Sequence, residues 1–588
     1  MNDHNNPQVA RLPEHLKQFI VEQHYEKYTP IDQAVWRYVM RQNYDYLKDV
    51  AFYPYIEGLK RAGLSIERIP DLETMNENLG KIGWGAVTVD GFIPPAAFME
   101  YQAYKVLVIA ADIRQIKHIE YTPAPDIIHE ASGHAPIIAD KDYAQYLQYI
   151  GEIGSKAMFS YNDFELYESI RHLSILKELH DANPEMLSKA ENDVFEKQQS
   201  LGKPSEMALL SRLHWWTVEY GLIDTATGPK IYGAGLLSSI GESASCMLDS
   251  VAKIPYTIDA VNVPFDITQT QPQLFVTPDF ENLITVLEEF ANKMAFRTGG
   301  KSGLEKAIEC KNICTVVLSS GIQISGVIDK IELDTNDEPS LIVFNSSVAL
   351  AFNHKQLRGW DKSVLDKGFI TPVGKIKNSA KLLEDLSDQQ IEEFKNTETD
   401  LSEFYFESGI VLKGVLRQLI KKNYKTIAII FSNCRVYGSI TGHDFYNEPE
   451  DFILTVGANV TSVFCGAADK DAYNQEAFIS KKTTPNFVEY SAEIIQLHQL
   501  YDQIARLRKV GGSDLEIKKI WETLKSNYPE DWLASMELYE YLITMDKLPA
   551  ISSEIKNSLE KTAIADPHLE KLVQDGFRVI KNQLKSFA

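Results

Sequence analysis

The chain has 588 residues, which is the length of about three or four ordinary domains. Its composition, 44% hydrophobic and 24% charged residues, is that of a globular protein and excludes whole-chain disorder, collagen and coiled-coil arrays. The 59 basic and 82 acidic residues give a net charge of -23, which disfavours nucleic acid and anionic membrane surfaces as partners.

The cysteines and the hydropathy pattern indicate the compartment. Five cysteines, an odd number thinly spread over the chain, argue against a disulfide framework and favour a reducing environment. The sequence shows no signal-peptide pattern at its start and no apolar run as long as a membrane span. We therefore expect a cytoplasmic protein.

The first half of the chain is predicted to be mainly helical. Helical apolar spacing runs from about residue 10 to 80, a loop rich in glycine and proline follows, and helical patterns return from residue 101 to about 296. The glycine-rich run Arg297–Gly303 is then predicted to be a linker, which gives a first domain of residues 1–297.

The second half is predicted to be a β-rich domain followed by helices. β-branched residues and turn residues predict a β-rich α+β domain over 304–487, and helical spacing predicts a helical region over 488–588. Residues 320–328 and 408–416, 88 residues apart, share the pattern S-G-I-x-[IL]-x-G-V-[IL]. This match predicts two related β units, with generic strand-turn-strand sequence as the alternative.

Two histidines, His129 and His134, form a candidate metal site. A straight α-helix turns about 500° over five residues, which leaves side chains with this spacing about 140° apart. Both imidazoles can face one metal only if the helix ends or unwinds at the second histidine, and Gly133 and Pro136 favour such an end.

Glu219 is the candidate third ligand. It lies among tryptophan and tyrosine residues, where a lone carboxylate is costly unless it is paired or bound to a metal. Two histidines and one carboxylate form the facial triad of non-haem Fe(II) oxygenases, although the same donors also permit zinc, and Glu219 could instead form a salt bridge.

Three sequence blocks resemble the pterin-dependent aromatic amino acid hydroxylases. Residues 121–136 read YTPAPDIIHEASGHAP, where the family has YTPEPDxxHELLGHxP. Residues 214–222 read HWWTVEYGL against YWFTVEFGL, and residues 232–242 read YGAGLLSSIGE against YGAGLLSSxGE. The resemblance covers about residues 10–297 and implies a mainly α hydroxylase-like catalytic domain, followed here by the β-rich α+β region and the C-terminal helices.

The resemblance also implies roles for individual residues. The Fe(II) ligands are His129, His134 and Glu219. The amino-acid substrate is bound by Arg114, which grips its α-carboxylate, and by Thr122, Pro123, Trp215, Gly235 and Ser238. The tetrahydropterin, a tetrahydrobiopterin-like cofactor, is bound by Ile93, Phe98 and Glu130, and O2 is the co-substrate.

The implied reaction is the hydroxylation of L-phenylalanine to L-tyrosine. Trp215 matches a position that is tryptophan in phenylalanine and tyrosine hydroxylases, and Ile267 stands where tyrosine hydroxylases place an aspartate. Tryptophan or tyrosine hydroxylation is the alternative. Departures from the family pattern include His214 in place of tyrosine and Ala124 in place of glutamate.

The C-terminal half has no motif that the resemblance explains. The sequence does not assign a role to it; the alternative interpretation makes it a regulatory or oligomerisation module, and the sequence leaves a homo-oligomer open. Cys310 and Cys314 are either half of a metal site or two ordinary buried cysteines. The expected partners are two small molecules, an amino acid and a pterin, with neither nucleic acid nor membrane.

Overall fold

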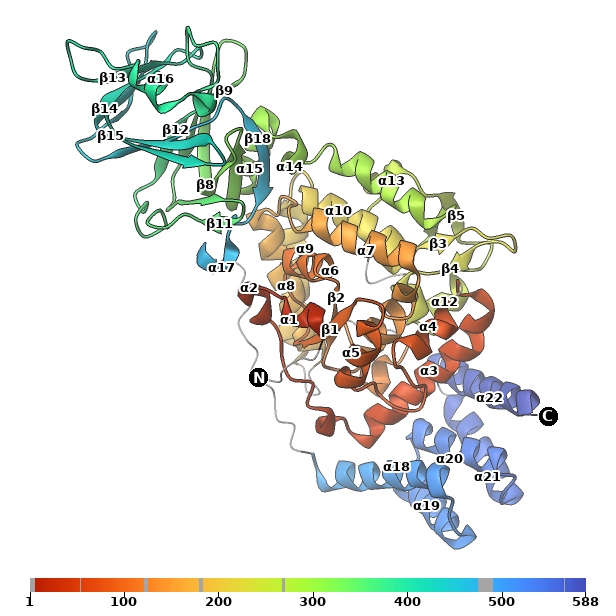
Figure 1. The fold of residues 1–588 in the computed structure, drawn as a ribbon. Helices are drawn as coiled ribbons and strands as arrows, with labels where there is room; N and C mark the ends of the chain where they lie inside the picture. The colour runs from red at the N-terminus through yellow and green to blue at the C-terminus, as the bar shows by residue number, and fades with distance from the viewer. Residues whose placement is uncertain are drawn as a thin grey trace.

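The computed structural model describes residues 6–52, 54–120, 125–178, 183–266, 270–473, 490–564 and 566–587. The described chain has three parts in the order that the sequence predicts: helices, then strands, then helices. Figure 1 shows the β-rich part at one end of the molecule and the last helices on the other side of the first part.

The first part is built mainly from helices around a large apolar core. Its helices are α1 (Pro7–Ala10), α2 (Glu14–Lys17), α3 (Pro30–Val50), α4 (Tyr55–Arg61), α5 (Leu72–Gly80), α6 (Pro95–Ala103), α7 (Lys141–Gly154), α8 (Tyr161–Glu178), α9 (Pro184–Ser200), α10 (Glu206–His214), α11 (Ala234–Leu237), α12 (Glu242–Ser245), α13 (Phe280–Ala291) and α14 (Ala295–Thr298). Its strands are β1 (Gly85–Val89), β2 (Val106–Ala110), β3 (Leu222–Ile223), β4 (Lys230–Ile231), β5 (Ala252–Pro255) and β6 (Gln273–Thr277). The parallel pair β1 and β2 lies beside α6 and leads into the candidate site.

Helix α3 illustrates how the local sequence sets these elements. Thr29 caps its N-terminus in a capping box, since the Thr29 hydroxyl accepts from the Asp32 N–H and the Asp32 carboxylate accepts from the Thr29 N–H. Pro30 follows at the first helical position, where no N–H is needed. One face of the helix then buries Trp36 and Val39 completely in the core.

The segment predicted to be a linker is instead helical. Residues 297–303 lie in α14 and α15 (Gly300–Cys310), which meet at Gly299 with a φ of 53°. A Cβ at Gly299 would lie 2.6 Å from the carbonyl oxygen of Val460, and one at Gly303 would lie 3.1 Å from the Val463 side chain. The glycines therefore permit close packing against a later strand, and the predicted boundary at 297 stays a proposal.

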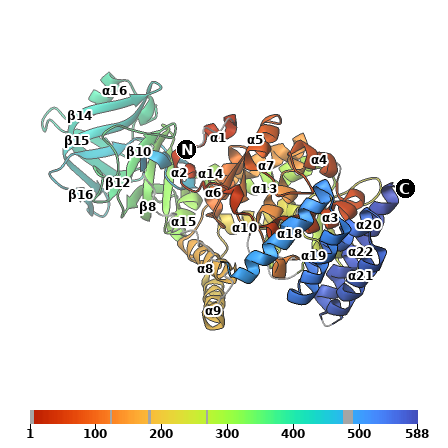
Figure 2. The ribbon, with the colours of Figure 1, turned by 90° about the horizontal axis from the view of Figure 1, so that it is seen from below.

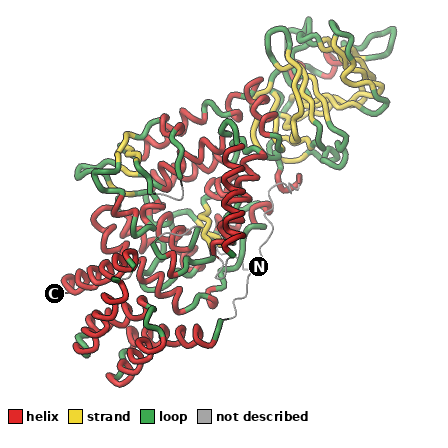
Figure 3. Tube along the Cα trace, turned by 180° about the vertical axis from the view of Figure 1, so that it is seen from behind, coloured by secondary structure: helices red, strands yellow, loops and turns green. Residues whose placement is uncertain are grey.

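The β-rich part gathers most of the strands of the described chain into one lobe (Figure 3). Its strands are β7 (Ile313–Leu318), β8 (Ile322–Leu333), β9 (Pro339–Phe344), β10 (Ala349–Phe352), β11 (Lys355–Gln356), β12 (Phe369–Pro372), β13 (Ser402–Tyr405), β14 (Ile410–Lys422), β15 (Lys425–Gly438), β16 (Asp444–Asn447), β17 (Phe452–Thr455) and β18 (Val460–Cys465). Two short helices, α16 (Asp388–Glu392) and α17 (Lys470–Tyr473), belong to the same part.

Strand registers repeat between the two halves of this lobe. Strand β8 pairs with β7 and β9 as β14 pairs with β13 and β15. The pair of Ile328 with Phe344 in the first half corresponds to the pair of Leu416 with Phe431 in the second. β12 continues beside β9 as β17 continues beside β15. These registers support the proposal of two related units.

The last part consists of α18 (Ala492–Val510), α19 (Asp514–Asn527), α20 (Trp532–Thr544), α21 (Pro549–Ala563) and α22 (Pro567–Phe587). Of these helices, α18, α20 and α22 lie beside α3 (Figure 2). The Arg37 guanidinium of α3 donates to both carboxylate oxygens of Glu537 at 2.6 and 2.8 Å, and both side chains are buried. A buried, bidentate ion pair thus joins the first and last parts of the chain.

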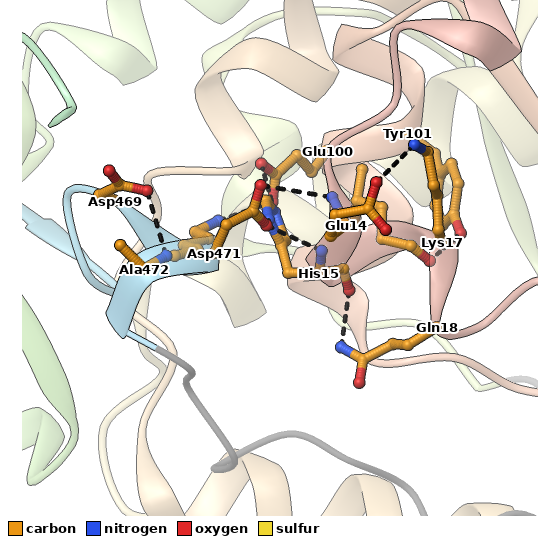
Figure 4. Close-up of polar contacts among 11 residues, drawn as sticks. Glu14, His15, Lys17, Gln18, Glu100, Tyr101, Asp469, Asp471 and Ala472 are labelled. Atoms are coloured by element: carbon orange, nitrogen blue, oxygen red, sulfur yellow. Dashed lines mark hydrogen bonds and ion pairs between the residues drawn. The ribbon is translucent and has the colours of Figure 1, made fainter. Parts of the chain in front are cut away.

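The β-rich part contacts the first part through α17 (Figure 4). The Asp471 carboxylate accepts from the backbone N–H of His15 at 2.8 Å, at the start of α2. Lys470 donates to Glu100 of α6 at 2.6 Å, and the other oxygen of Glu100 lies 3.0 Å from Nε2 of His15. We refer to these four residues as the α17 contact.

Of the helices in the described ranges, none combines the length and the apolar run that crossing a bilayer requires.

Candidate metal centre

His129 and His134 lie on a π-helix, η3 (Ile128–His134). Backbone hydrogen bonds in a π-helix run from residue i to i+5, so residues five apart lie above one another as residues four apart do in an α-helix. The two histidines therefore share a face, and their ring centroids are 5.1 Å apart. The prediction from straight-helix geometry is corrected here: the helix does end at His134, but it is its wider winding that brings the two rings together.

Glu219 is the last residue of a second π-helix, η5 (Trp215–Glu219), which continues α10. One carboxylate oxygen lies 3.3 Å from Nε2 of His129, and the other lies 3.4 Å from Nε2 of His134. Two neighbouring ligand atoms that each bind one metal at about 2.1 Å are about 3 Å apart. The three side chains thus have the spacing of a single metal site.

A second carboxylate, that of Glu130, also approaches the histidines. Its Oε2 lies 3.7 Å from Nε2 of His134, and the ligand atoms of Glu130, His129 and His134 all lie within 4.8 Å of one another. Burial raises the pKa of Glu130 to about 8. Burial alone would also raise the pKa of Glu219, but the attraction of His134 and the hydrogen bond with His129 lower it to about 2. Glu219 is therefore the anionic carboxylate and the better ligand of the two.

Unpartnered polar atoms at the site fit a bound cation. Both ring nitrogens of His134 are buried without a hydrogen-bond partner, and so is Oε2 of Glu130. Burial lowers the pKa of His134 to about 3, so its imidazole is neutral and offers a lone pair. Leaving such groups unpaired is costly, and a metal bound by His134 would remove part of that cost. The donor set and its burial thus fit Fe(II) or another divalent metal.

The His129 ring is oriented by Ser238. Its Nδ1 lies 2.9 Å from the Ser238 hydroxyl, which in turn donates to the carbonyl oxygen of Ala234 at 2.8 Å. The serine oxygen therefore accepts from the Nδ1–H of His129, which holds the ring with Nε2 facing Glu219. Ser238, which the sequence predicts to line the substrate pocket, thus lies directly behind a candidate ligand.

Arg114 is buried against Asp126. Its Nε and Nη2 donate to the two carboxylate oxygens at 2.7 and 2.9 Å, and Asp126 also accepts from the backbone N–H of His129 at 2.9 Å. A third donor, Nη1, lies 3.4 Å from the carbonyl oxygen of Ile119. A guanidinium has five N–H donors, so one on each Nη is left for another anion. These two N–H groups form the outer edge of the guanidinium, and they are compatible with the predicted binding of a substrate carboxylate.

The other predicted pocket residues lie beside Glu219. Trp215 stacks between Tyr220 and Phe265, with ring centroids 4.6 and 4.4 Å away. A Cβ at Gly235 would lie 2.8 Å from the Tyr220 ring and 3.0 Å from the backbone oxygen of Glu219, so this position requires glycine. Three predicted positions, Thr122, Pro123 and Ile267, and the departure at Ala124 lie outside the described residues.

Two of the predicted pterin residues, Ile93 and Phe98, lie at or just before the start of α6. Ile93 is buried just before α6, and Phe98 on α6 meets the His214 ring edge-on at a centroid distance of 5.7 Å. Nδ1 of His214 lies 3.8 Å from Glu219, and its Nε2 lies 3.3 Å from Nε2 of Gln102. The departure at His214 thus stands between the aromatic platform and the candidate ligand.

Sequence reasoning missed Gln102, although a signal for it existed. Gln102 follows Phe98 by four residues on α6, and residues four apart share a helix face. A search for polar residues on the face of Phe98 would have found it.

Residues 20–160 and 186–299 match the model of the biopterin-dependent aromatic amino acid hydroxylase family. The part of the chain that carries His129, His134 and Glu219 is therefore similar to the domain that this family model describes. Among its relatives is the phenylalanine-4-hydroxylase of Pseudomonas aeruginosa, which is 27% identical over 264 residues, covering 45% of this chain and 84% of the relative. Residues 300–588 lie outside the family match.

The phenylalanine-4-hydroxylase of Chromobacterium violaceum is 28% identical over 285 residues, covering 46% of this chain and 81% of the relative. A crystal structure of the Chromobacterium violaceum phenylalanine hydroxylase bound to cobalt is 26% identical and covers 49% of this chain and 92% of that chain, with a TM-score of 0.37.

Proposed function

We propose that the first half of the chain is a non-haem Fe(II), tetrahydropterin-dependent monooxygenase that hydroxylates L-phenylalanine to L-tyrosine with O2. The observation that carries this proposal is the buried meeting of His129, His134 and Glu219, with both carboxylate oxygens 3.3 to 3.4 Å from the imidazole nitrogens. Two imidazoles and one carboxylate leave adjacent coordination positions open, as oxygenase chemistry requires. The family match supplies the biopterin.

The residues around the ligands have separable tasks in this proposal. When bound, the iron and the reduced pterin supply the chemistry that activates O2. Ser238 fixes the His129 ring, and the outer edge of the Arg114 guanidinium holds the substrate carboxylate. Tyr220 and Phe265 stack on Trp215 and hold it in place, so that its edge packs against the substrate ring, while Phe98 stacks on the pterin. The chain thereby holds the reacting groups in register.

Phenylalanine is the substrate that the relatives favour, because the curated proteins similar to this chain are named phenylalanine-4-hydroxylases. Trp215 agrees with that choice and disfavours tryptophan hydroxylation. We further propose that the partners are two small molecules, an amino acid and a pterin, and that the protein acts in the cytoplasm.

The test is a competition assay on the full chain. The protein is stripped of metal and reconstituted with Fe(II) without oxygen. It is then mixed with air, a tetrahydropterin and an equimolar mixture of the three aromatic amino acids, in which phenylalanine is labelled and tyrosine and tryptophan are not. We expect labelled tyrosine from phenylalanine as the main product by mass spectrometry. Hydroxytryptophan as the main product would overturn the substrate, and activity with zinc but not iron would overturn the reaction class.

Two variants make the assay specific to the site. His134→Ala should lose both iron and product while keeping the circular dichroism of the parent, because the surrounding core is large. His118→Ala, on a short helix outside the site, should keep both. Equal loss in the two variants would remove His134 from the role.

A further inference from the structure

Three cysteine thiols meet where the β-rich part joins the first part. Cys310 ends α15, Cys314 lies in β7 and Cys465 ends β18. Their sulfur atoms all lie within 4.8 Å of one another, and the three side chains are buried. The other two cysteines, Cys246 and Cys434, are buried elsewhere and belong to no such group among the described residues.

The backbone aims these thiols at one another. Cys314 and Cys465 are direct cross-strand partners in the antiparallel pair of β7 and β18. The next pair along is hydrogen-bonded, since the N–H of Gly466 donates to the carbonyl oxygen of Ile313 at 2.8 Å. Cys314 and Cys465 therefore occupy a non-hydrogen-bonded pair, where facing side chains come closest. The left-handed Lys311, with a φ of 52°, ends α15 and leaves Cys310 beside this pair.

A fourth sulfur atom lies beside the three thiols. The thioether sulfur of Met158, which belongs to the first part of the chain, lies 3.8 Å from the Cys314 sulfur. The Cys465 sulfur also lies 3.8 and 3.9 Å from the carbonyl oxygens of Ile313 and Phe159.

These distances suit coordination better than plain packing. Sulfur atoms that bind one Zn2+ at about 2.3 Å are about 3.8 Å apart, within the spread found here. A buried cysteine that only fills space behaves as a small apolar side chain and needs no second thiol beside it. Thiolate and thioether donors select Zn2+ and Cu+ over hard cations.

We propose that Cys310, Cys314 and Cys465 bind one thiophilic metal ion, Zn2+ or Cu+, with the Met158 sulfur as the fourth donor. Binding displaces thiol protons to the solvent. Cys310 ends the helix before the β-rich strands, Cys314 lies in the first of these strands and Cys465 ends the last, so the ion fastens the first and last elements of that part together. Because Met158 lies in the first part, the ion also fastens the joint between the two parts.

The test uses cobalt as the probe on the full chain, reduced and freed of metal. Only sulfur ligands give Co2+ a thiolate-to-metal charge-transfer band, so the histidine site does not contribute to this signal. Because the histidine site also takes up Co2+, the titration uses the full chain with His134→Ala, in which we expect the band to saturate at one Co2+ per chain and Zn2+ or Cu+ added without oxygen to displace it. Displacement at one equivalent identifies the ion, and the absence of any band overturns the proposal.

Two substitutions of equally buried cysteines separate the site from general thiol binding. Cys314→Ser should lose the band, and Cys434→Ser in β15 should keep it. Loss of the band in both variants would overturn the proposal. If Cys314→Ser does not fold, the His134→Ala chain decides, because its histidine site is removed: the ion should raise its melting temperature in proportion to the logarithm of free metal, and no rise overturns the proposal.

Discussion

Gly133 is a position where a single methyl group should disturb the proposed metal centre. Gly133 immediately precedes His134 on η3 and lies against α11. A Cβ there would lie 2.6 Å from the backbone oxygen of Ala234 and 3.0 Å from its Cβ. The first distance falls about 0.8 Å short of the 3.4 Å at which ordinary contact begins. Since the obstacle is backbone, η3 and α11 must separate.

The size of this shift sets the expected effect of Gly133→Ala. Metal sites tolerate deviations of about 0.2 Å in ligand distance, so a shift several times larger should weaken metal binding. We expect the Fe(II) affinity to fall about 10-fold to 100-fold, which is the usual effect of removing a group that orients a metal ligand. The free energy of unfolding should fall by about 1–3 kcal/mol, which is the usual cost of overpacking a core. Phenylalanine hydroxylation should fall with iron occupancy.

The assay is a dialysis titration of Fe(II), with thermal unfolding of the metal-free protein alongside. Gly241→Ala is the matched control, because Gly241 has an ordinary φ of -90° and the nearest atom to its Cβ is 3.8 Å away. An unchanged iron affinity in Gly133→Ala, with the fold intact, would refute the argument that close packing of η3 on α11 places His134.

Three further contacts are tested by substitution, the second of them with a control variant. Ser238→Ala removes the hydroxyl behind His129, and we expect Fe(II) affinity to fall about 10-fold to 100-fold in the same titration. Glu537→Ala leaves a buried guanidinium of α3 unpaired and should lower the opening free energy of α20 by about 3–5 kcal/mol in hydrogen exchange, whereas Glu554→Ala in an exposed pair should cost less than about 1 kcal/mol. For Glu100, burial acts to raise the pKa, but ion pairs outweigh it and lower the pKa from 4.5 to about 2, so its stabilisation is complete above about pH 4.5 and is lost as the pH falls toward 2. Glu100→Gln should flatten this acid limb of the stability curve.

Each of these expectations has a contrary result. Full iron affinity in Ser238→Ala would mean that the serine does not hold the ring. Equal costs for Glu537→Ala and Glu554→Ala would mean that burial adds nothing to the first pair. An unchanged acid limb in Glu100→Gln would assign the acid sensitivity to other carboxylates.

The sequence predicts the order of the three parts and the residues that meet at the metal centre. It could not predict how His129 and His134 come to face one way, because a π-helix depends on packing around it and has no compositional signature. The same limit applies to the segment before α15. Glycines there signal flexibility when seen alone, and only a distant strand reveals that they permit close packing.

Long-range partners are the other gap. The sequence shows two members of the cysteine cluster, Cys310 and Cys314, close together in the chain. The third member, Cys465, joins them only through the pairing of β18 with β7. Gln102 joins His214 in the same way, through the approach of α6 to α10. Pair spacing along the chain therefore identifies the ligands that share a helix, and tertiary structure supplies the rest.

The α17 contact bears on any attempt to study the first half alone. Glu100, which receives Lys470, and Phe98, the predicted pterin platform, are separated by half a turn of α6. A fragment ending at residue 298 would retain His129, His134 and Glu219. It would, however, lose the ion pair of Lys470 with Glu100, which would expose the Glu100 carboxylate to water and remove a contact that holds this part of α6 in place. Iron binding by such a fragment and its handling of the pterin should consequently be measured separately, because intact ligands do not guarantee an intact platform.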